Sequence, residues 1–140
     1  MKIKKTFPVK SHYSFESKIV NASVPLNNGN KDENNISSID LNELFVPNSE
    51  KYFLVNVVGD SMIGANIFHG DILIVDSKAE AKDGSIVIAA LNNETAVKTL
   101  RKIDGILYLY SENEKFVPIE IKPYIEFVIQ GVVKHIIHEF

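Results

Sequence analysis

The chain has 140 residues, of which 45% are hydrophobic, and its formal net charge is −3. These values suit one compact domain with a real core, and they give no basic footprint for direct, sequence-specific DNA binding. Without cysteine the chain has no disulfide, no thiolate nucleophile and no cysteine metal site. Neither a signal-peptide core nor an apolar run long enough to cross a membrane is found, so a cytoplasmic protein is expected.

Residues 1–38 are predicted to form a flexible N-terminal arm. The arm begins with a basic cluster, interpreted as a solvated tail, and it has a short β-prone piece at Ile19 and Val20. The polar stretch 27–35 has almost nothing to bury, so it cannot offset the entropy lost on ordering. This stretch is therefore predicted to be a linker. The lysines of the basic cluster are Lys2, Lys4, Lys5 and Lys10.

Residues 39–140 are predicted to form one globular domain. A short helix is expected over 39–45, with Asp40 as its N-cap and Glu43 completing a capping box. After this helix, β-prone runs are separated by turn residues, including a tight turn at Asn92 and Asn93. The pattern predicts a mainly β, mostly antiparallel domain. Strands are expected over 52–58, 71–76, 85–91, 94–100, 106–110, 116–121 and 124–135.

A serine follows directly after the strand expected over 52–58, in the run Gly59-Asp60-Ser61-Met62. Small residues in this turn make close backbone approach easy. A hydroxyl beside free backbone N–H groups is what acyl transfer requires, so Ser61 is the candidate nucleophile. The same residues can also form an ordinary loop turn.

The hydroxyl of a serine needs a base, and Lys98 is the first candidate. Strand alternation places Ala96, Lys98 and Leu100 on one face, which must be at least partly apolar. Loss of water there disfavours the ammonium and lowers the lysine pKa. The alternative is a strand lysine whose amine reaches water. His69 is a second candidate base, interpreted mainly as a surface turn residue; structural or solvent roles are favoured for His12, His135 and His138.

Acidic residues near the serine do not indicate a metal. The spacing of Asp60, His69, Asp71 and Asp76 matches no standard ligand pattern, and turns or strand ends explain the aspartates. No metal and no cofactor are therefore predicted.

Together these motifs closely resemble the LexA/UmuD family of self-cleaving serine–lysine peptidases. The resemblance rests on residues 59–62, 70–76, 83–87 and 96–100, and it covers about residues 20–138. Lys98 follows Ser61 by 37 residues, which is similar to the dyad spacing of the family. Residues 39–42, with the sequence Ile-Asp-Leu-Asn, resemble the UmuD branch in particular. The resemblance implies a compact, antiparallel β-rich peptidase domain of the β-clip type.

The resemblance also implies a mechanism. Ser61 would attack a peptide carbonyl of the same chain or of a dimer mate, and neutral Lys98 would accept its proton. Backbone N–H groups of Asp60 and Ser61 would hold the oxyanion. Residues 20–25 are similar to the family's cleavage segment, so the scissile bond is expected between Ala22 and Ser23.

Two positions depart from the family's pattern. Ser23 replaces the usual Gly of the cleavage segment, and the bond between Asn28 and Gly29 is a second, weaker candidate. Asn66 stands where relatives often have Gly, and Asn tolerates the left-handed backbone angles that such a position needs.

Resemblance to the UmuD branch implies partners as well. It implies a homodimer, activation by the RecA–single-stranded-DNA filament, and a trimmed form that joins a Y-family, UmuC-like polymerase. This polymerase would be the error-prone lesion-bypass enzyme of the SOS DNA-damage response. Only about 20 residues precede the candidate cleavage segment, too few for a helix-turn-helix domain of the LexA type.

Two further classes compete with the self-cleaving peptidase. A non-catalytic, dimerising accessory subunit would have the same fold, and Ser23 supports it. A signal-peptidase-like enzyme also uses a Ser-Met motif with a lysine base, but the sequence has no membrane anchor that would suit it.

Overall fold

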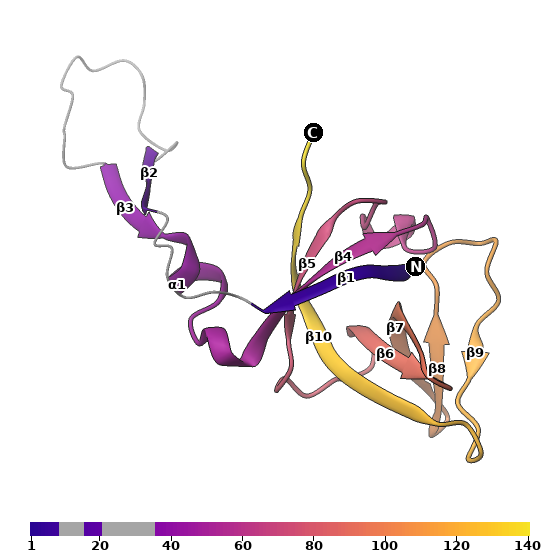
Figure 1. The fold of residues 1–140 in the computed structure, drawn as a ribbon. Helices are drawn as coiled ribbons and strands as arrows, with labels where there is room; N and C mark the ends of the chain where they lie inside the picture. Colours follow the sequence, from indigo (N-terminus) through magenta and orange to yellow (C-terminus); the bar gives the residue numbers. More distant parts are fainter. Residues whose placement is uncertain (9–15, 21–35) are drawn as a thin grey trace. The chain divides into compact units, whose positions relative to one another are not determined.

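The computed structural model describes residues 1–8, 16–20 and 36–140, which fall into two compact units (Figure 1). The larger unit comprises Met1–Val9 and Glu50–Phe140, and the smaller comprises Lys10–Ser49. The predicted linker over 27–35 lies outside the described residues. Within the described part of the chain, no helix has the length and apolar character needed to span a membrane.

An 8-stranded sheet builds the larger unit, with the strand order β1-β4-β5-β10-β6-β7-β8-β9. Among the described residues its strand pairs are antiparallel, and β1 pairs with β7 as well as with β4. This architecture confirms the predicted mainly β fold. The strands are β1 Lys2–Pro8, β4 Tyr52–Val58, β5 Ile72–Asp76, β6 Ile86–Leu91, β7 Glu94–Ile103, β8 Ile106–Tyr110, β9 Ile119–Glu120 and β10 Phe127–Ile137.

Each strand expected from residue 52 onward is present, and several of their ends differ from the expected bounds by one to three residues. The strand expected over 116–121 is reduced to Ile119–Glu120, and the one expected from residue 124 begins at Phe127. Pro118 and Pro123 stand just before these elements, and a proline donates no ladder hydrogen bond.

Two tight turns fix the register of β6, β7 and β8. Asn92 and Asn93 have φ angles of 47° and 67°, which confirms the predicted turn between β6 and β7. Asp104 and Gly105 connect β7 to β8 with φ angles of 51° and 78°. Successive left-handed residues form the hairpin turn that matches the twist of the strands. As a result, Ile103 faces Ile106 at the end of this hairpin.

The smaller unit combines one hairpin with a short helix. β2 Glu16–Val20, which contains the predicted β-prone piece, pairs antiparallel with β3 Ile36–Asp40. α1 Leu41–Phe45 follows, and the carboxylate of Asp40 accepts a hydrogen bond of 2.9 Å from the Asn42 N–H. The predicted helix with Asp40 as N-cap is thus confirmed, whereas β3 has no counterpart among the predicted strands.

The first residues of the chain form a strand, where the sequence indicated a solvated tail. β1 pairs with β4 from Lys2 opposite Val58 to Pro8 opposite Phe53 (Figure 1). Met1 is only 7% exposed and belongs to the core, while Lys2 is exposed. Apolar and charged residues therefore alternate here at the period of a strand. The division of the chain into an arm over 1–38 and a domain over 39–140 stays a prediction.

Core residues of the larger unit gather in two clusters. Val97 of β7 belongs to the first cluster and Leu100 to the second, so β7 contributes to both. Because alternate residues share a face, Lys98 lies on the same side of β7 as Leu100. The first cluster consists of Met1, Val55, Val57, Met62, Ile67, Leu73, Val75, Ile88 and Val97; the second consists of Val87, Ala89, Leu100, Leu109 and Val132.

Replacing Thr99 by Val is expected to stabilise the domain by about 1 kcal/mol. Thr99 is 3% exposed, and among the described residues its hydroxyl has no hydrogen-bond partner. Valine has nearly the same shape and removes the cost of burying an unpaired hydroxyl. Urea unfolding followed by circular dichroism measures the change. Thr95→Val, on a half-buried position of the same strand, is the control and should change stability by less than about 0.5 kcal/mol.

Candidate functional site

The candidate nucleophile is held in a turn that leaves β4. Gly59 has a φ of +104°, an angle that favours glycine, and it turns the chain out of the sheet. Ser61 follows and is only 2% exposed. Met62, which is fully buried in the first core cluster, anchors the turn directly after the serine. The hydroxyl of Ser61 therefore lies at a position that the core fixes.

The turn continues into η3 Ile63–Ala65, which packs against a distant segment. Gly64 N–H donates a hydrogen bond of 2.7 Å to the carbonyl oxygen of Glu112. A Cβ atom at Gly64 would lie 2.7 Å from that oxygen, so only glycine permits this approach. Asn66 ends η3 with φ 60° and ψ 31°, which confirms the expected left-handed conformation.

Lys98, the candidate base, is half-buried on β7. Burial removes water from its amine and lowers the pKa below the usual 10.5, in the direction that the sequence predicts. Its Nζ lies 2.6 Å from the hydroxyl oxygen of Ser111 and 5.8 Å from the ring centroid of Phe116. The amine thus has one polar neighbour and one aromatic neighbour, both from the segment that follows β8.

Met1 stands between the serine and β7. Its α-amine donates a hydrogen bond to Ser61 Oγ, and its carbonyl oxygen accepts one of 3.1 Å from the Val97 N–H. Burial, and then the charge of Lys98, lower the pKa of this amine to about 6, while Asp60 acts in the opposite direction. The Met1 amine is therefore bonded to Ser61 and lies within the electrostatic influence of Lys98.

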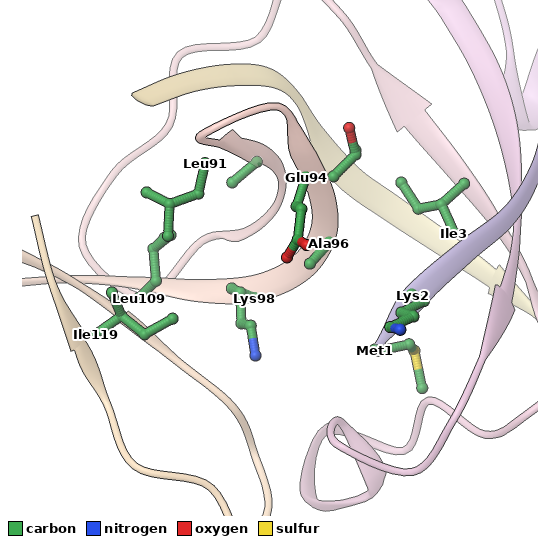
Figure 2. Close-up of a pocket in the computed structure, with 11 residues that line it drawn as sticks. Met1, Lys2, Ile3, Leu91, Glu94, Ala96, Lys98, Leu109 and Ile119 are labelled. Atoms are coloured by element: carbon green, nitrogen blue, oxygen red, sulfur yellow. The ribbon is translucent and has the colours of Figure 1, made fainter. Parts of the chain in front are cut away.

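A cavity of about 440 Å³ opens beside Lys98. Figure 2 shows the side chains of Lys98 and Met1 on opposite sides of the same open space. Leu91, Leu109 and Ile119 form apolar walls, and Glu94 places a carboxylate among the lining residues. The lining thus combines apolar side chains with the charged groups of Lys2, Glu94 and Lys98.

The two predicted dyad residues are brought to one site but do not bond to each other. Among the described residues, Ser61 Oγ bonds to the Met1 amine and Lys98 Nζ bonds to Ser111. Asp60, the other predicted oxyanion residue, is exposed, and its carbonyl oxygen accepts a hydrogen bond of 2.9 Å from Asn113 Nδ2. The predicted cleavage residues Ala22 and Ser23 lie outside the described residues, as do Asn28 and Gly29.

His69 is exposed beside the serine turn. Its Nδ1 accepts a hydrogen bond of 3.3 Å from the Gly59 N–H, which confirms its interpretation as a surface turn residue. His138 Nδ1 lies 2.6 Å from the carboxylate of Asp71, which is 2% exposed. His135 lies in β10, and His12 is outside the described residues.

The predicted turn role of the aspartates holds for the two buried ones. Asp71 accepts a hydrogen bond from the Phe68 N–H, and Asp76 accepts two from the N–H groups of Lys78 and Ala79. Within the part of the chain that the structure describes, no group of three or more histidine and acidic side chains is placed to hold a metal ion.

Sequence reasoning missed three residues of the candidate site: Met1 at Ser61, Ser111 at Lys98, and Asn113 at Asp60. The position of Ser111 could have been predicted from the sequence, because a two-residue turn at Asp104 and Gly105 fixes the register between β7 and β8. Counting back from this turn places Ser111 opposite Lys98. The pairing of Thr99 with Tyr110, one step earlier, agrees with that count.

The fold and the site define a β-rich domain in which Met1 bonds to a buried serine and lines one cavity together with a half-buried lysine. A family model described as Peptidase S24-like matches residues 18–134. The chain therefore belongs to the Peptidase S24-like family, in agreement with the LexA/UmuD resemblance at the level of the family.

Curated relatives are LexA repressors. The LexA repressor of Dechloromonas aromatica is 42% identical over 90 residues, which cover 64% of this chain and 44% of the relative. LexA repressor 2 of Pseudomonas putida is 40% identical over 80 residues, or 57% of this chain and 40% of the relative. The LexA repressor of Oleidesulfovibrio alaskensis is 42% identical over 99 residues, which cover 71% of this chain and 48% of the relative. The chain spans less than half the length of these relatives.

Proposed function

We propose that this chain is a self-cleaving serine peptidase with Ser61 as nucleophile and Lys98 as general base. One observation carries the proposal: the Met1 amine bonds to the buried Ser61 hydroxyl, and Met1 lines one cavity together with the partly desolvated Lys98. A lysine accepts a proton near neutral pH only when its pKa is lowered, and burial lowers the pKa of Lys98. Membership of the Peptidase S24-like family supports the same chemistry.

In the proposed reaction, Ser61 Oγ attacks the carbonyl carbon of Ala22 while its proton passes to Lys98 Nζ. The N–H groups of Asp60 and Ser61 stabilise the oxyanion of the tetrahedral intermediate. Lys98 then gives the proton to the departing nitrogen of Ser23, which leaves an ester between Ala22 and Ser61. A water molecule, deprotonated by Lys98, hydrolyses this ester and regenerates the serine.

We place the chain in the UmuD branch of the family. The Ile-Asp-Leu-Asn run at residues 39–42 supports this placement, and Asp40 of the run caps α1. The product would be the accessory subunit of an error-prone translesion polymerase of the UmuC-like Y family in the SOS response. A homodimer and activation by the RecA–single-stranded-DNA filament belong to the same proposal.

A non-catalytic accessory subunit is the second candidate function. The bonding of the two candidate residues favours it, because Ser61 and Lys98 each bond to a different group in the structure. For cleavage, the Met1 amine has to leave Ser61 Oγ so that the hydroxyl can reach Lys98 and the substrate. A chain that never makes this change would keep the fold and the partners without the chemistry.

Incubating the purified full-length protein at mildly alkaline pH is expected to give a new fragment that begins at Ser23. The reason is that Lys98 must be neutral to accept the proton of Ser61. Intact-mass spectrometry over time, with and without RecA filament, measures the fragment and its first residue. A fragment that begins at Gly29 would move the cleavage site to the second candidate bond.

Ser61→Ala is the control for this experiment and should give no fragment under any condition. If the unaltered chain stays full-length even with activated RecA filament, the peptidase proposal is excluded and the accessory subunit is favoured. A cleaved Ser61→Ala protein would show that a contaminating protease makes the fragment.

A further inference from the structure

The segment over residues 111–113 contacts Lys98 and the turn that holds Ser61. Ser111 Oγ lies 2.6 Å from Lys98 Nζ, the Glu112 carbonyl accepts a hydrogen bond from Gly64, and Asn113 Nδ2 donates one to the Asp60 carbonyl. We propose that this segment positions the lysine and the serine turn relative to each other, with Ser111 as the positioning residue for the Lys98 amine. The inference rests on the proposed peptidase function.

Pairing of β7 with β8 explains why Ser111 reaches the amine. Thr99 lies opposite Tyr110 in this pair, so the next position along β7, Lys98, faces Ser111. Residues directly opposite each other on adjacent strands share a face, with their Cβ atoms about 5 Å apart. β8 ends at Tyr110, so the chain leaves the sheet at Ser111 while the hydroxyl remains beside Lys98.

The serine turn is held from the other side of the same segment. Gly64 approaches Glu112 so closely that a Cβ atom would lie 2.7 Å from the carbonyl oxygen. The amide of Asn113 bonds to the carbonyl of Asp60, the residue directly before the nucleophile. A shift of the segment would therefore move the Ser61 turn and the Lys98 amine relative to each other.

Hydrogen bonds within the loop fix the conformation of the segment. The Asn113 side-chain oxygen accepts a bond of 3.1 Å from the Lys115 N–H, and the Asn113 carbonyl accepts one of 3.1 Å from the Phe116 N–H. The Phe116 ring, 5.8 Å from Lys98 Nζ, closes the apolar side of the amine. Ser111 is thus fixed at its own position and can fix the lysine in turn.

Positioning matters for this base because a lysine side chain has about 2 kcal/mol of rotamer entropy. A neutral amine has two N–H groups and one lone pair. When one N–H donates to Ser111 Oγ, the nitrogen is held near the site and the lone pair stays available for the Ser61 proton. Ser111 itself gains and loses no proton in the proposed reaction, so it acts through Lys98.

A matched pair of substitutions tests the hydroxyl. Ser111→Val and Ser111→Thr add nearly the same bulk, but only threonine keeps a hydroxyl. We expect Ser111→Val to slow self-cleavage of the full-length chain about tenfold or more, because misplacement of a catalytic group by about 1 Å can cost about a hundredfold. Ser111→Thr should stay within a few-fold of the unaltered chain. Equal rates for the two variants, whether fast or slow, would overturn the inference.

A second measurement reads Lys98 without any cleavage. In the Ser61→Ala protein, the ¹³Cε signal of Lys98 is titrated by NMR and assigned by its loss in Lys98→Met. Removing the hydroxyl in Ser111→Val withdraws an acceptor from the ammonium, so the midpoint should move to lower pH. Asn113→Ala, which removes the side-chain bonds to Asp60 and Lys115 but keeps the Ser111 hydroxyl, should slow cleavage in the active chain and leave this midpoint in place.

The two measurements separate the positioning inference from the proposed function. If the unaltered chain never cleaves but Ser111→Val shifts the Lys98 titration, the peptidase function fails while the contact of Ser111 with the amine is real. If the chain cleaves and Ser111→Val changes neither the rate nor the titration, the function stands and the positioning role is wrong.

Discussion

Replacing Lys98 by Met is expected to slow self-cleavage at least about a hundredfold while the domain stays folded. General-base catalysis contributes about 10²–10⁴-fold to a rate, and methionine has a similar length but no amine to accept the Ser61 proton. The appearance of the fragment that begins at Ser23 measures the effect. Lys102→Met, at an exposed lysine of the same strand, is the matched control and should cleave at the normal rate.

The pH dependence identifies the amine. In the unaltered chain the rate should rise with pH as Lys98 loses its proton, and level off at a pKa below the usual 10.5. The Met1 amine, with a pKa of about 6, has lost its proton before this range. The rise above pH 7 should therefore disappear in Lys98→Met. A variant that keeps the same rise would show that another group is the base.

The Lys98→Met substitution should change stability in the opposite direction from activity. Because burial lowers the Lys98 pKa in the folded state, the charged lysine makes the folded state less stable. This penalty is fully present below the folded-state pKa, and it disappears as pH rises toward the unfolded value of 10.5. Lys98→Met should thus be at least as stable as the unaltered chain at neutral pH, with a smaller difference at high pH.

Gly131→Ala is expected to destabilise the domain by about 3 kcal/mol, the upper end of the usual cost of overpacking. Gly131 is buried where β10 passes from its pairing with β6 to its pairing with β5. A Cβ atom there would lie 2.5 Å from Val75 Cγ1, 2.9 Å from the Asp76 carbonyl oxygen and 3.2 Å from Phe53 Cε1. The backbone oxygen belongs to a central strand and has little room to move.

Urea unfolding at constant pH measures this loss as a lower midpoint with an unchanged slope. Gly105→Ala is the control, because a Cβ atom there meets nothing within 4 Å and only its φ of +78° is unfavourable. It should cost about 1 kcal/mol. Val75→Ala removes the atom nearest to the new Cβ. The double variant Val75→Ala/Gly131→Ala should therefore lose less stability than the sum of the two single losses. A Gly131→Ala protein as stable as the Gly105→Ala protein would contradict the packing argument.

Most of the fold could be predicted because strand periodicity and turn chemistry are local. Asn92 and Asn93 adopt the left-handed angles that their sequence favours, and the strands on either side follow from their apolar residues. β1 could not be predicted in this way. Its charged residues indicate solvent, and only pairing with β4 and the burial of Met1 make it a strand.

By itself, the sequence determined the identity of the two candidate catalytic residues. Ser61 follows a strong strand in a turn of small residues, and Lys98 lies among apolar residues whose burial lowers its pKa. Both signals are local, because they depend on neighbours along the chain and on the period of a strand.

Only the tertiary structure decided which groups these two residues contact. The Met1 amine at Ser61 and the Ser111 hydroxyl at Lys98 come from segments distant in sequence. Their positions depend on the β1–β7 pairing and on the register of the β7–β8 hairpin. A hydrogen bond requires atoms to lie within about 3 Å, and strand pairing, rather than spacing along the chain, sets distances on that scale.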